Sequence, residues 1–379
     1  MTREAVGAIV DTLGGDVRVE PILVDPPGPG EVLVRIAASG ICHSDLWARD
    51  NGNWDAPFPM LLGHEGAGIV EEVGAGVEAP SIGDHVVLSW AVPCGTCPPC
   101  RRGVPRRCMH AWTQPPRLRR ARDAAPLAGT LSLGTLASHT VVHAAQAITM
   151  PPELPLRSAC LLGCGVSTGV GAATQTAKVW PGARVAVIGL GGIGLAALQG
   201  ARIAGAEQLI AVDLVPTKLE WARRLGATDT VDASSVDAVA AVRERAGGDG
   251  VDVAFEATGV PAVVAQAVQM LAYAGVAVAI GVPPIPATVT LDWNGADGAA
   301  YPNKASLVIT DGGDPIPAVD FPEMARWALE GRLDLAGMVT RELGLEDLDE
   351  AFRAMLAGEV IRSVVRLDRA GAPRSGSHR

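Results

Sequence analysis

The sequence has few aromatic and few charged residues, which make up 4% and 19% of its 379 positions. With 48% hydrophobic residues it nevertheless has enough apolar side chains to fold, which excludes a disordered or collagen-like chain. We therefore expect a largely aliphatic core. The length exceeds what one hydrophobic core usually organises, so two domains are expected.

Excess positive charge is also missing, because the formal net charge is −10. This value argues against general affinity for nucleic acid or anionic membranes. No uninterrupted apolar run reaches about 18 residues, the length of a membrane-spanning helix. The N-terminus, MTREAVGAIVDTLGGD, lacks a basic segment followed by an apolar stretch of signal-peptide length. We therefore expect a cytoplasmic protein with no nucleic-acid or membrane partner.

A disulfide framework is not expected either. Such frameworks belong mainly to small secreted domains, whereas this long chain has seven cysteines, an odd number. Four of the seven lie within 15 residues. The cysteines therefore indicate metal binding.

Two kinds of hydrophobic pattern divide the chain. Up to about residue 90, short runs such as VLVRIA and AGIVEEVG alternate with turns, which predicts an all-β beginning. From about residue 180, strand and helix patterns alternate, which predicts βαβ units and a parallel sheet. We expect strands at 184–190, 209–213, 251–258, 276–282 and 363–367, and helices at 191–205, 216–227, 261–274, 321–333 and 345–359.

The clustered cysteines have the spacing C-x2-C-x2-C-x7-C and are Cys94, Cys97, Cys100 and Cys108. Four converging thiolates suit tetrahedral zinc and leave no position for substrate, so the predicted ion is structural. An iron–sulfur cluster is the alternative, but no other feature indicates electron transfer. Eight arginines between residues 101 and 122 allow a zinc-stabilised nucleic-acid-binding module, although the acidic remainder favours a solvated basic loop.

A second set of metal-ligating residues is dispersed along the chain. Cys42 lies in GICHSDLW, His64 in LLGHEGAGIV and Cys164 in LLGCGVSTGVG. Two thiolates and one imidazole leave a fourth zinc position open, which is the ligand set of a catalytic zinc in alcohol dehydrogenase. Singly, each cysteine could be a small core residue. The combination predicts a catalytic zinc, and hence two zinc ions per chain.

A glycine-rich turn, GLGGIG, lies between a predicted strand and a predicted helix. Gly189, Gly191 and Gly194 form G-x-G-x-x-G, which lets a pyrophosphate approach the backbone at a helix N-terminus. Asp213 ends the next predicted strand, where its carboxylate can bind ribose hydroxyls. The same charge repels the extra phosphate of NADP, so NAD is the expected cofactor.

Taken together and in order, GICHSD, LLGHEGAGIVEEVG, the four-cysteine loop, LLGCGVSTGVGAA, VIGLGGIG and GEVIRSVVRL resemble the zinc-dependent alcohol dehydrogenases of the medium-chain dehydrogenase/reductase family. The resemblance covers residues 6 to 367 and is greatest to class III-like enzymes. It implies an α/β fold with a discontinuous GroES-like β-rich catalytic domain at 1–166 and 310–379. An inserted Rossmann domain with a doubly wound parallel sheet is implied at 167–309.

The resemblance also implies roles for individual residues. Ser44 matches the hydroxyl that hydrogen-bonds the reacting alcohol, Asp45 the carboxylate that orients the histidine ligand, and Glu65 a residue that approaches the metal transiently. The implied cofactor contacts are His43, Thr168, Gly189, Gly191, Gly192, Ile193, Gly194, Asp213, Lys218 and Arg362. Cys160 matches a cysteine that is not a ligand, so we expect it to be buried and inert.

Three features depart from the family pattern. Trp47 stands where many relatives have the histidine that ends a proton relay, and tryptophan cannot titrate. The segments 111–138 and 308–320 also differ, in regions where the family builds substrate-pocket or subunit contacts. The substrate identity is therefore left open by the sequence.

The expected activity is hydride transfer between NAD and a primary or secondary alcohol, or the matching aldehyde or ketone. The class III-like motifs leave a thiol-dependent formaldehyde dehydrogenase acting on an S-hydroxymethyl thiol as the alternative. A zinc-free quinone-reductase-like enzyme is disfavoured, since it would not need Cys42, His64 and Cys164 together. The resemblance also implies a homodimer or homotetramer, with subunit contacts around 285–310.

Overall fold

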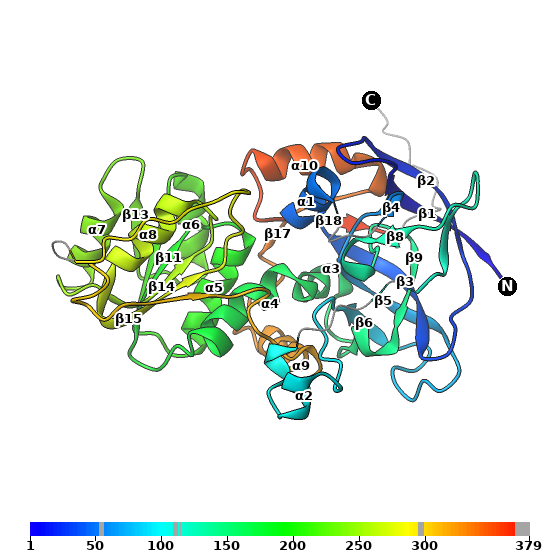
Figure 1. The fold of residues 1–379 in the computed structure, drawn as a ribbon, viewed down its shortest axis with the longest axis horizontal. Coiled ribbons are helices and arrows are strands. Elements are labelled where there is room, and N and C mark those ends of the chain that lie inside the picture. Colours follow the sequence, from blue (N-terminus) through cyan, green and yellow to red (C-terminus); the bar gives the residue numbers. More distant parts are fainter. Residues whose placement is uncertain (53–56, 109–112, 114, 295–298, 368–379) are drawn as a thin grey trace. The chain divides into compact units, whose positions relative to one another are not determined.

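The computed structural model describes residues 1–52, 57–108, 113, 115–294 and 299–367. Part of the segment 111–138, which differs from the family pattern, therefore lies outside the described residues. The chain forms two compact units (Figure 1). The first unit comprises 1–163, 317–325 and 335–379, and the second comprises 164–316 and 326–334. The first unit is therefore discontinuous in sequence.

Two sheets form the β-rich part of the first unit. One has the order β7 (Leu118–Arg120), β2 (Val17–Val24), β1 (Arg3–Val10), β4 (Met60–Leu61) and β8 (Ala128–Gly129). The other has the order β10 (Ala147–Thr149), β6 (His85–Leu88), β5 (Glu65–Val73), β3 (Glu31–Gly40), β18 (Arg362–Arg366) and β17 (Val339–Leu343), and β9 (His139–His143) also pairs with β3. The late strands β17 and β18 thus complete a sheet begun near the N-terminus.

Short helices connect and cover these sheets. They are α1 (His43–Asn51), α2 (Pro98–Arg101), α3 (Leu156–Ala159), the 3-10 helix η4 (Cys160–Gly163) and α10 (Leu348–Leu356). Helix α1 corrects the predicted all-β beginning. It forms because the Asp45 carboxylate accepts a hydrogen bond from the Cys42 N–H at the helix start, a local cap that hydrophobic periodicity does not reveal.

The second unit contains a parallel sheet, as the sequence predicts. Its order is β13 (Asp229–Asp232), β12 (Gln208–Asp213), β11 (Arg184–Ile188), β14 (Val251–Glu256), β15 (Leu271–Ala279) and β16 (Ser306–Ile309). Numbered from β11, this order is 3-2-1-4-5-6, and it changes direction between β11 and β14. Ligands of such sheets bind outside the carboxyl ends of the strands at that change of direction.

The helices of this unit are α4 (Gly165–Gly171), α5 (Gly192–Ile203), α6 (Pro216–Arg224), α7 (Ala238–Arg245) and α8 (Pro261–Gln269). One core is made by apolar residues of the sheet together with α7 and α8. The predicted helix at 261–274 is too long, because Ala274 has a positive φ of 60° and residues from Leu271 onward pair with β14. The sequence patterns gave no prediction for β13 or α7.

Helix α9 (Pro317–Leu329) begins before the predicted helix at 321–333. Pro317 occupies its first turn, where the missing N–H costs no helical hydrogen bond. No single helix among the described residues is long and apolar enough to span a membrane. One bent pair, Leu156–Gly163 with Gly165–Thr176, meets the length and composition criteria together, and its residues 158–173 are buried within the protein.

Candidate functional site

The structure brings together the three dispersed residues that the sequence predicts as ligands. One ligand atom each from Cys42, His64, Glu65 and Cys164 lies within 4.8 Å of the others. All four residues are buried. Cys42 immediately precedes α1, and His64 immediately precedes β5, whose first residue is Glu65. The cluster is therefore built where three separate segments of the chain meet.

Cys164 reaches this cluster because Gly163 lies directly against β5. A Cβ atom at Gly163 would lie 2.9 Å from the carbonyl oxygen of Leu88 and 3.2 Å from the Cα atom of Glu65. Only glycine permits so close a backbone approach. Since Cys164 is the next residue in the chain, this contact fixes its position beside His64 and Glu65. The sequence did not single out Gly163.

Asp45 orients the imidazole of His64. Its Oδ1 lies 3.0 Å from the Nδ1 of His64 and also accepts a 3.0 Å hydrogen bond from the Gly63 N–H. Both side chains are fully buried. A ligating histidine commonly places its second nitrogen against a carboxylate in this way. The contact leaves Nε2 as the nitrogen that faces the cluster.

The donor set fits zinc. The buried Nε2 of His64 has no hydrogen-bond partner among the described residues, and an unpaired buried nitrogen is costly unless something binds it. Two cysteine sulfurs and one imidazole nitrogen are preferred zinc ligands. Burial lowers the pKa of His64, but the Asp45 carboxylate outweighs burial, so without metal its pKa is well above the usual value. A metal at Nε2 would displace that proton, because the ligand must be neutral.

Glu65 and Arg362 form a buried ion pair at the edge of the cluster. The Oε2 of Glu65 contacts the Nη2 of Arg362, and both side chains are at most 7% exposed. Burial raises the pKa of Glu65, and the nearby Arg362 only partly offsets this effect. The sequence resemblance predicts Arg362 as a cofactor contact. The structure places it against Glu65, a pairing that the sequence did not predict.

Helix α1 also carries three other residues that the sequence singles out. The Ser44 hydroxyl lies 3.7 Å from the sulfur of Cys42, so it sits next to the predicted metal position. His43 is exposed, and Trp47 is half-buried one turn further along the helix. Cys160, expected to be inert, is fully buried, and burial raises the pKa of its thiol.

The other four cysteines converge on a second point. Their sulfurs lie within 4.8 Å of one another, and none of the seven cysteines, all of them among the described residues, forms a disulfide bond. The sulfurs of Cys97 and Cys108 are 3.7 Å apart, far longer than a disulfide bond. The residues in this second cluster are Cys94, Cys97, Cys100 and Cys108.

The electrostatics of this loop also favour a cation. Hydrogen bonds from Thr96 and the Cys97 N–H lower the pKa of Cys94 to about 5. Burial and the neighbouring sulfurs raise the pKa of Cys100 to about 12. Four sulfurs this close cannot all ionise unless a positive ion is shared between them. The geometry and the donor chemistry fit a closed zinc site.

The glycine-rich turn lies at the carboxyl end of β11 and the start of α5. Gly189 has a φ of 88°, which glycine adopts readily. A Cβ atom built on Gly191 would have no other atom within 4 Å, so space is open over the turn for a ligand to approach the backbone. A Cβ on Gly194 would collide with the Gly189 carbonyl, which explains the third glycine. The turn fits a dinucleotide pyrophosphate, and Gly192 and Ile193 begin α5 there.

Asp213 stands at the end of β12, beside this turn. Its Oδ2 accepts a 2.7 Å hydrogen bond from the Leu190 N–H, and its Oδ1 accepts a 3.0 Å bond from the Val215 N–H. The carboxylate is therefore held rigidly, and each oxygen retains a lone pair for a ribose hydroxyl. Lys218 is half-buried on α6, and Thr168 is buried on α4.

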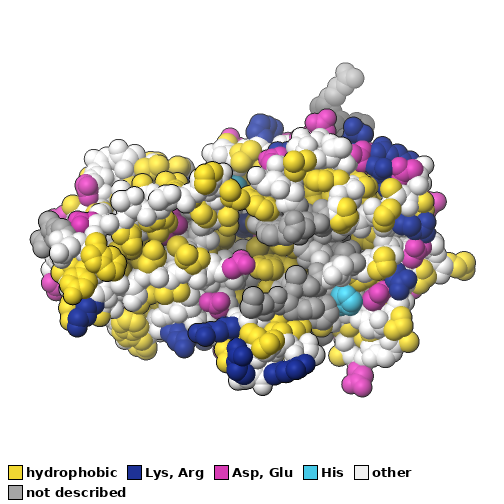
Figure 2. Space-filling model, in the orientation of Figure 1, with side chains coloured by type: hydrophobic (Ala, Val, Ile, Leu, Met, Phe, Trp, Pro, Cys, Tyr) yellow, Lys and Arg dark blue, Asp and Glu magenta, His cyan; other side chains and the backbone are white. Residues whose placement is uncertain are grey.

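The arginines after the four-cysteine loop are largely committed to carboxylates. Arg117 pairs with Glu31 at 2.7 Å, and Arg119 pairs with Asp25 at 2.8 Å. Two further arginines, Arg120 and Arg122, pair with Asp123, Asp11 and Glu20. Binding of a phosphate backbone by these side chains would require breaking such pairs. Other Lys and Arg side chains gather over α2 (Figure 2).

Comparison with known proteins places these observations in a family. The family profile "Alcohol dehydrogenase GroES-like domain" matches residues 28–152, and "Zinc-binding dehydrogenase" matches 192–328. An S-(hydroxymethyl)glutathione dehydrogenase of Synechocystis is 35% identical over 376 residues, covering 94% of this chain and 98% of that protein.

Two solved structures are also similar. A protein of Burkholderia ambifaria, described as an alcohol dehydrogenase zinc-binding domain protein, has a TM-score of 0.90 at 35% identity and covers 97% of this chain and 99% of its own. Benzyl alcohol dehydrogenase of Acinetobacter calcoaceticus has a TM-score of 0.87 at 28% identity, with 96% and 99% covered. Sequence and structure therefore point to the same family.

Proposed function

Because the chain belongs to the zinc-dependent alcohol dehydrogenases of the medium-chain dehydrogenase/reductase family, we propose that its substrate is a primary or secondary alcohol, or the matching aldehyde or ketone. The protein is a zinc-containing oxidoreductase that uses NAD(H). One observation supports the proposed reaction site most directly. The buried ligand atoms of Cys42, His64 and Cys164 converge beside the Ser44 hydroxyl, with the Nε2 of His64 left unpaired.

We assign the catalytic zinc to Cys42, His64 and Cys164, with Asp45 orienting the histidine. When bound, zinc supplies a Lewis acid that makes the substrate hydroxyl more acidic, and NAD supplies the hydride acceptor. Ser44 then takes the proton of that hydroxyl. Trp47 cannot pass this proton on, so the proton leaves through water or another group rather than through a histidine at that position. Glu65, held by Arg362, supplies a buried carboxylate at the edge of the metal site.

The remaining sites follow from the same family membership. Cys94, Cys97, Cys100 and Cys108 hold a second, structural zinc. The turn at 189–194 binds the NAD pyrophosphate, and Asp213 and Lys218 bind the adenosine ribose. We further propose His43, Thr168 and Arg362 as cofactor contacts. We also propose a cytoplasmic location, which accords with the lack of a disulfide bond among the seven cysteines.

A second candidate substrate is an S-hydroxymethyl thiol such as S-(hydroxymethyl)glutathione, the substrate in the name of the Synechocystis relative. Glutathione carries two carboxylates, so its recognition would need cationic side chains. The arginines at 117, 119, 120 and 122 are already paired with acidic residues of this chain. These four arginines are therefore not available for the carboxylates of glutathione, which favours an uncharged alcohol or carbonyl compound. Recognition of glutathione would have to use other cations, such as the exposed Arg101, Arg102 and Arg107.

A substrate panel distinguishes the two candidates. NADH absorbance should appear with simple primary or secondary alcohols and should not depend on glutathione. Activity confined to formaldehyde with glutathione would favour the second candidate. Protein with its full metal content that forms no NADH with any alcohol or aldehyde, even with an artificial hydride acceptor present, would contradict both.

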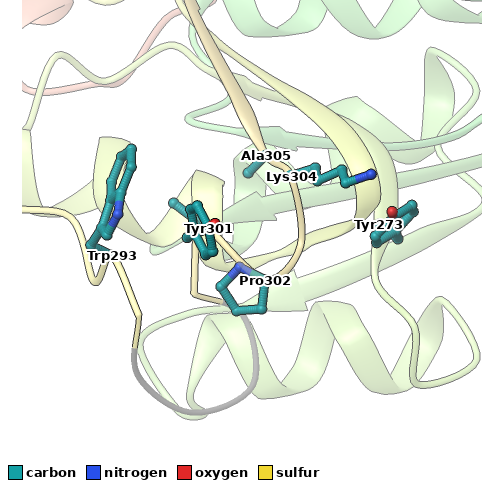
Figure 3. Close-up of a pocket in the computed structure, with 7 residues that line it drawn as sticks. Tyr273, Trp293, Tyr301, Pro302, Lys304 and Ala305 are labelled. Carbon is teal, nitrogen blue, oxygen red and sulfur yellow. The ribbon is translucent and has the colours of Figure 1, made fainter.

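We also propose that the protein is a homo-oligomer, at least a dimer, formed through the exposed edge of β16. This strand pairs only with β15 among the described residues, and its apolar side chains are exposed, Ile309 by 80%. An open apolar edge is a template for pairing with another chain. Aromatic side chains also line a cavity in the same unit. Tyr273, Trp293 and Tyr301 line a cavity of about 440 Å³, in which Lys304 reaches toward the ring of Tyr273 (Figure 3).

A further inference from the structure

Glu256, the last residue of β14, has a carboxylate that the reaction described above does not use. Its side chain is completely buried. Its Oε1 accepts hydrogen bonds from the Thr258 N–H at 2.6 Å, from the Gly259 N–H at 2.9 Å and from the Thr258 hydroxyl. Glutamate is almost never buried completely unless it is paired. Here its partners are the backbone and side chain of the loop that follows it, residues 257–260.

This 257–260 loop lies against the glycine-rich turn. A Cβ atom on Gly189 would be 2.6 Å from the Cγ2 methyl of Thr258, so the loop occupies the space beside the first glycine. The Ala257 N–H also donates to the carbonyl of Ile188, the residue before Gly189, at 2.9 Å. The two loops follow β11 and β14, the strands between which the sheet order changes direction. The 257–260 loop therefore borders the place where ligands of such sheets bind.

Glu256 also ties the loop to the next strand. Its carbonyl accepts hydrogen bonds from the Ile280 N–H at 2.8 Å and from the Gly281 N–H at 3.2 Å. The Thr258 hydroxyl, which donates to Glu256, accepts a 3.1 Å bond from the Val260 N–H. The backbone carbonyl of Glu256 therefore ties the end of β14 to the segment after β15, and its carboxylate fixes the turn at Thr258 and Gly259. If the loop moved away from Gly189, the buried Glu256 carboxylate would lose its acceptor bonds and the buried Gly259 N–H would lose its partner.

We infer that Glu256 is a positioning residue for the dinucleotide. It holds the 257–260 loop against Gly189 and so keeps the phosphate-binding turn in the conformation that receives the pyrophosphate, although its buried carboxylate does not touch the cofactor. This inference rests on the proposed assignment of the turn at 189–194 to NAD. It predicts that Glu256 governs the affinity for NAD(H) and leaves the alcohol site unchanged.

Two substitutions at this position separate shape from hydrogen bonding. Glu256→Leu keeps the bulk but removes both side-chain acceptors, whereas the amide oxygen of Glu256→Gln can still accept from the loop. We expect Glu256→Leu to raise the dissociation constant of NADH about tenfold, the effect of losing a charge-assisted hydrogen bond. Glu256→Gln should stay close to the wild type. The KM for the alcohol at saturating NAD should not change in either variant.

The dissociation constant is measured by NADH fluorescence titration of the zinc-loaded protein, with Glu244→Gln, an exposed carboxylate on α7, as control. If Glu256→Leu does not fold, Thr258→Val tests the same link. It keeps a methyl group beside Gly189 but removes the hydroxyl between Glu256 and Val260, and it should also weaken NADH binding. An unchanged NADH affinity in a folded Glu256→Leu or Thr258→Val protein overturns the inference. So does a Glu256→Gln protein as impaired as Glu256→Leu.

Asp213→Gly distinguishes failure of this inference from failure of the proposed cofactor site. If Asp213→Gly weakens NADH binding and Glu256→Leu does not, only the positioning role is wrong. If neither substitution changes the affinity of a protein that binds NADH, the turn at 189–194 is not the cofactor site. In that case the inference fails together with the assignment on which it rests.

Discussion

At the metal site, Gly40 leaves room for the Glu65 carboxylate because it has no side chain. A Cβ atom on Gly40, at the end of β3, would lie 2.1 Å from the Oε2 of Glu65 and 3.1 Å from its Cβ. Gly40 and Glu65 are register partners in neighbouring strands. The absence of a side chain at Gly40 is therefore what lets the Glu65 carboxylate reach Arg362.

Gly40→Ala should displace the Glu65 carboxylate from Arg362. Crowding a packed core and disturbing a buried ion pair should lower the free energy of unfolding by about 1–3 kcal/mol, as measured by denaturant titration. The control is the same substitution in a Glu65→Ala background, where the added methyl group no longer meets a carboxylate. An equal loss in both backgrounds would show that the collision with Glu65 is not the cause.

At the scale of elements, α1 and the four-cysteine loop have different tasks. Helix α1 positions Cys42, Ser44 and Asp45 at one end of the buried metal cluster. The four-cysteine loop forms its own closed cluster and reaches α9 through Arg106, whose guanidinium is 2.8 Å from the buried carboxylate of Asp320. The loop therefore contacts α9 through this ion pair, in addition to forming the four-cysteine site.

Zinc analysis separates these two elements. The wild-type protein should contain two zinc ions per chain. Cys42→Ala should contain one and lose hydride transfer, because an open site with three ligands is broken. Cys100→Ser should also contain one, but it should retain activity at low temperature and melt at a lower temperature, since a structural zinc contributes to folding. Two zinc ions in Cys42→Ala would contradict the assignment of the catalytic site.

At the scale of the whole molecule, the proposed subunit contact through the edge of β16 can be tested. Ile309→Lys places a charge on the exposed apolar edge and should convert the oligomer into smaller species in light scattering after size-exclusion chromatography. Leu13→Lys, which changes another exposed apolar residue, on the first unit, is the control and should leave the mass unchanged. An unaltered oligomer in Ile309→Lys would place the subunit contact elsewhere.

The division of the chain into two compact units is also a property of the whole molecule. The two compact units meet in sequence between residues 163 and 164, and α9 contributes residues to both. The predicted boundaries at 166 and 310 stay a proposal about which segments fold as autonomous domains. Their test is the folding of the separately produced segment 167–309.

The sequence by itself determined the elements with strong local signals. A continuous apolar strand, a glycine-rich turn and an amphipathic helix predict β11, the turn at 189–194 and α5 because each depends on residues close together in the chain. The spacing of the clustered cysteines likewise predicts a closed metal site. The types and order of the dispersed ligands, Cys42, His64 and Cys164, could also be read, but only as candidates.

Only the tertiary structure decided what depends on distant segments. It brought Cys164 to His64 through the close approach of Gly163, and it paired Glu65 with Arg362 across nearly 300 residues of chain. It also showed that the arginines at 117 to 122 face carboxylates and that Glu256 holds the loop beside Gly189. No local pattern encodes these contacts, since a buried charge is determined by which segments the folded chain packs around it.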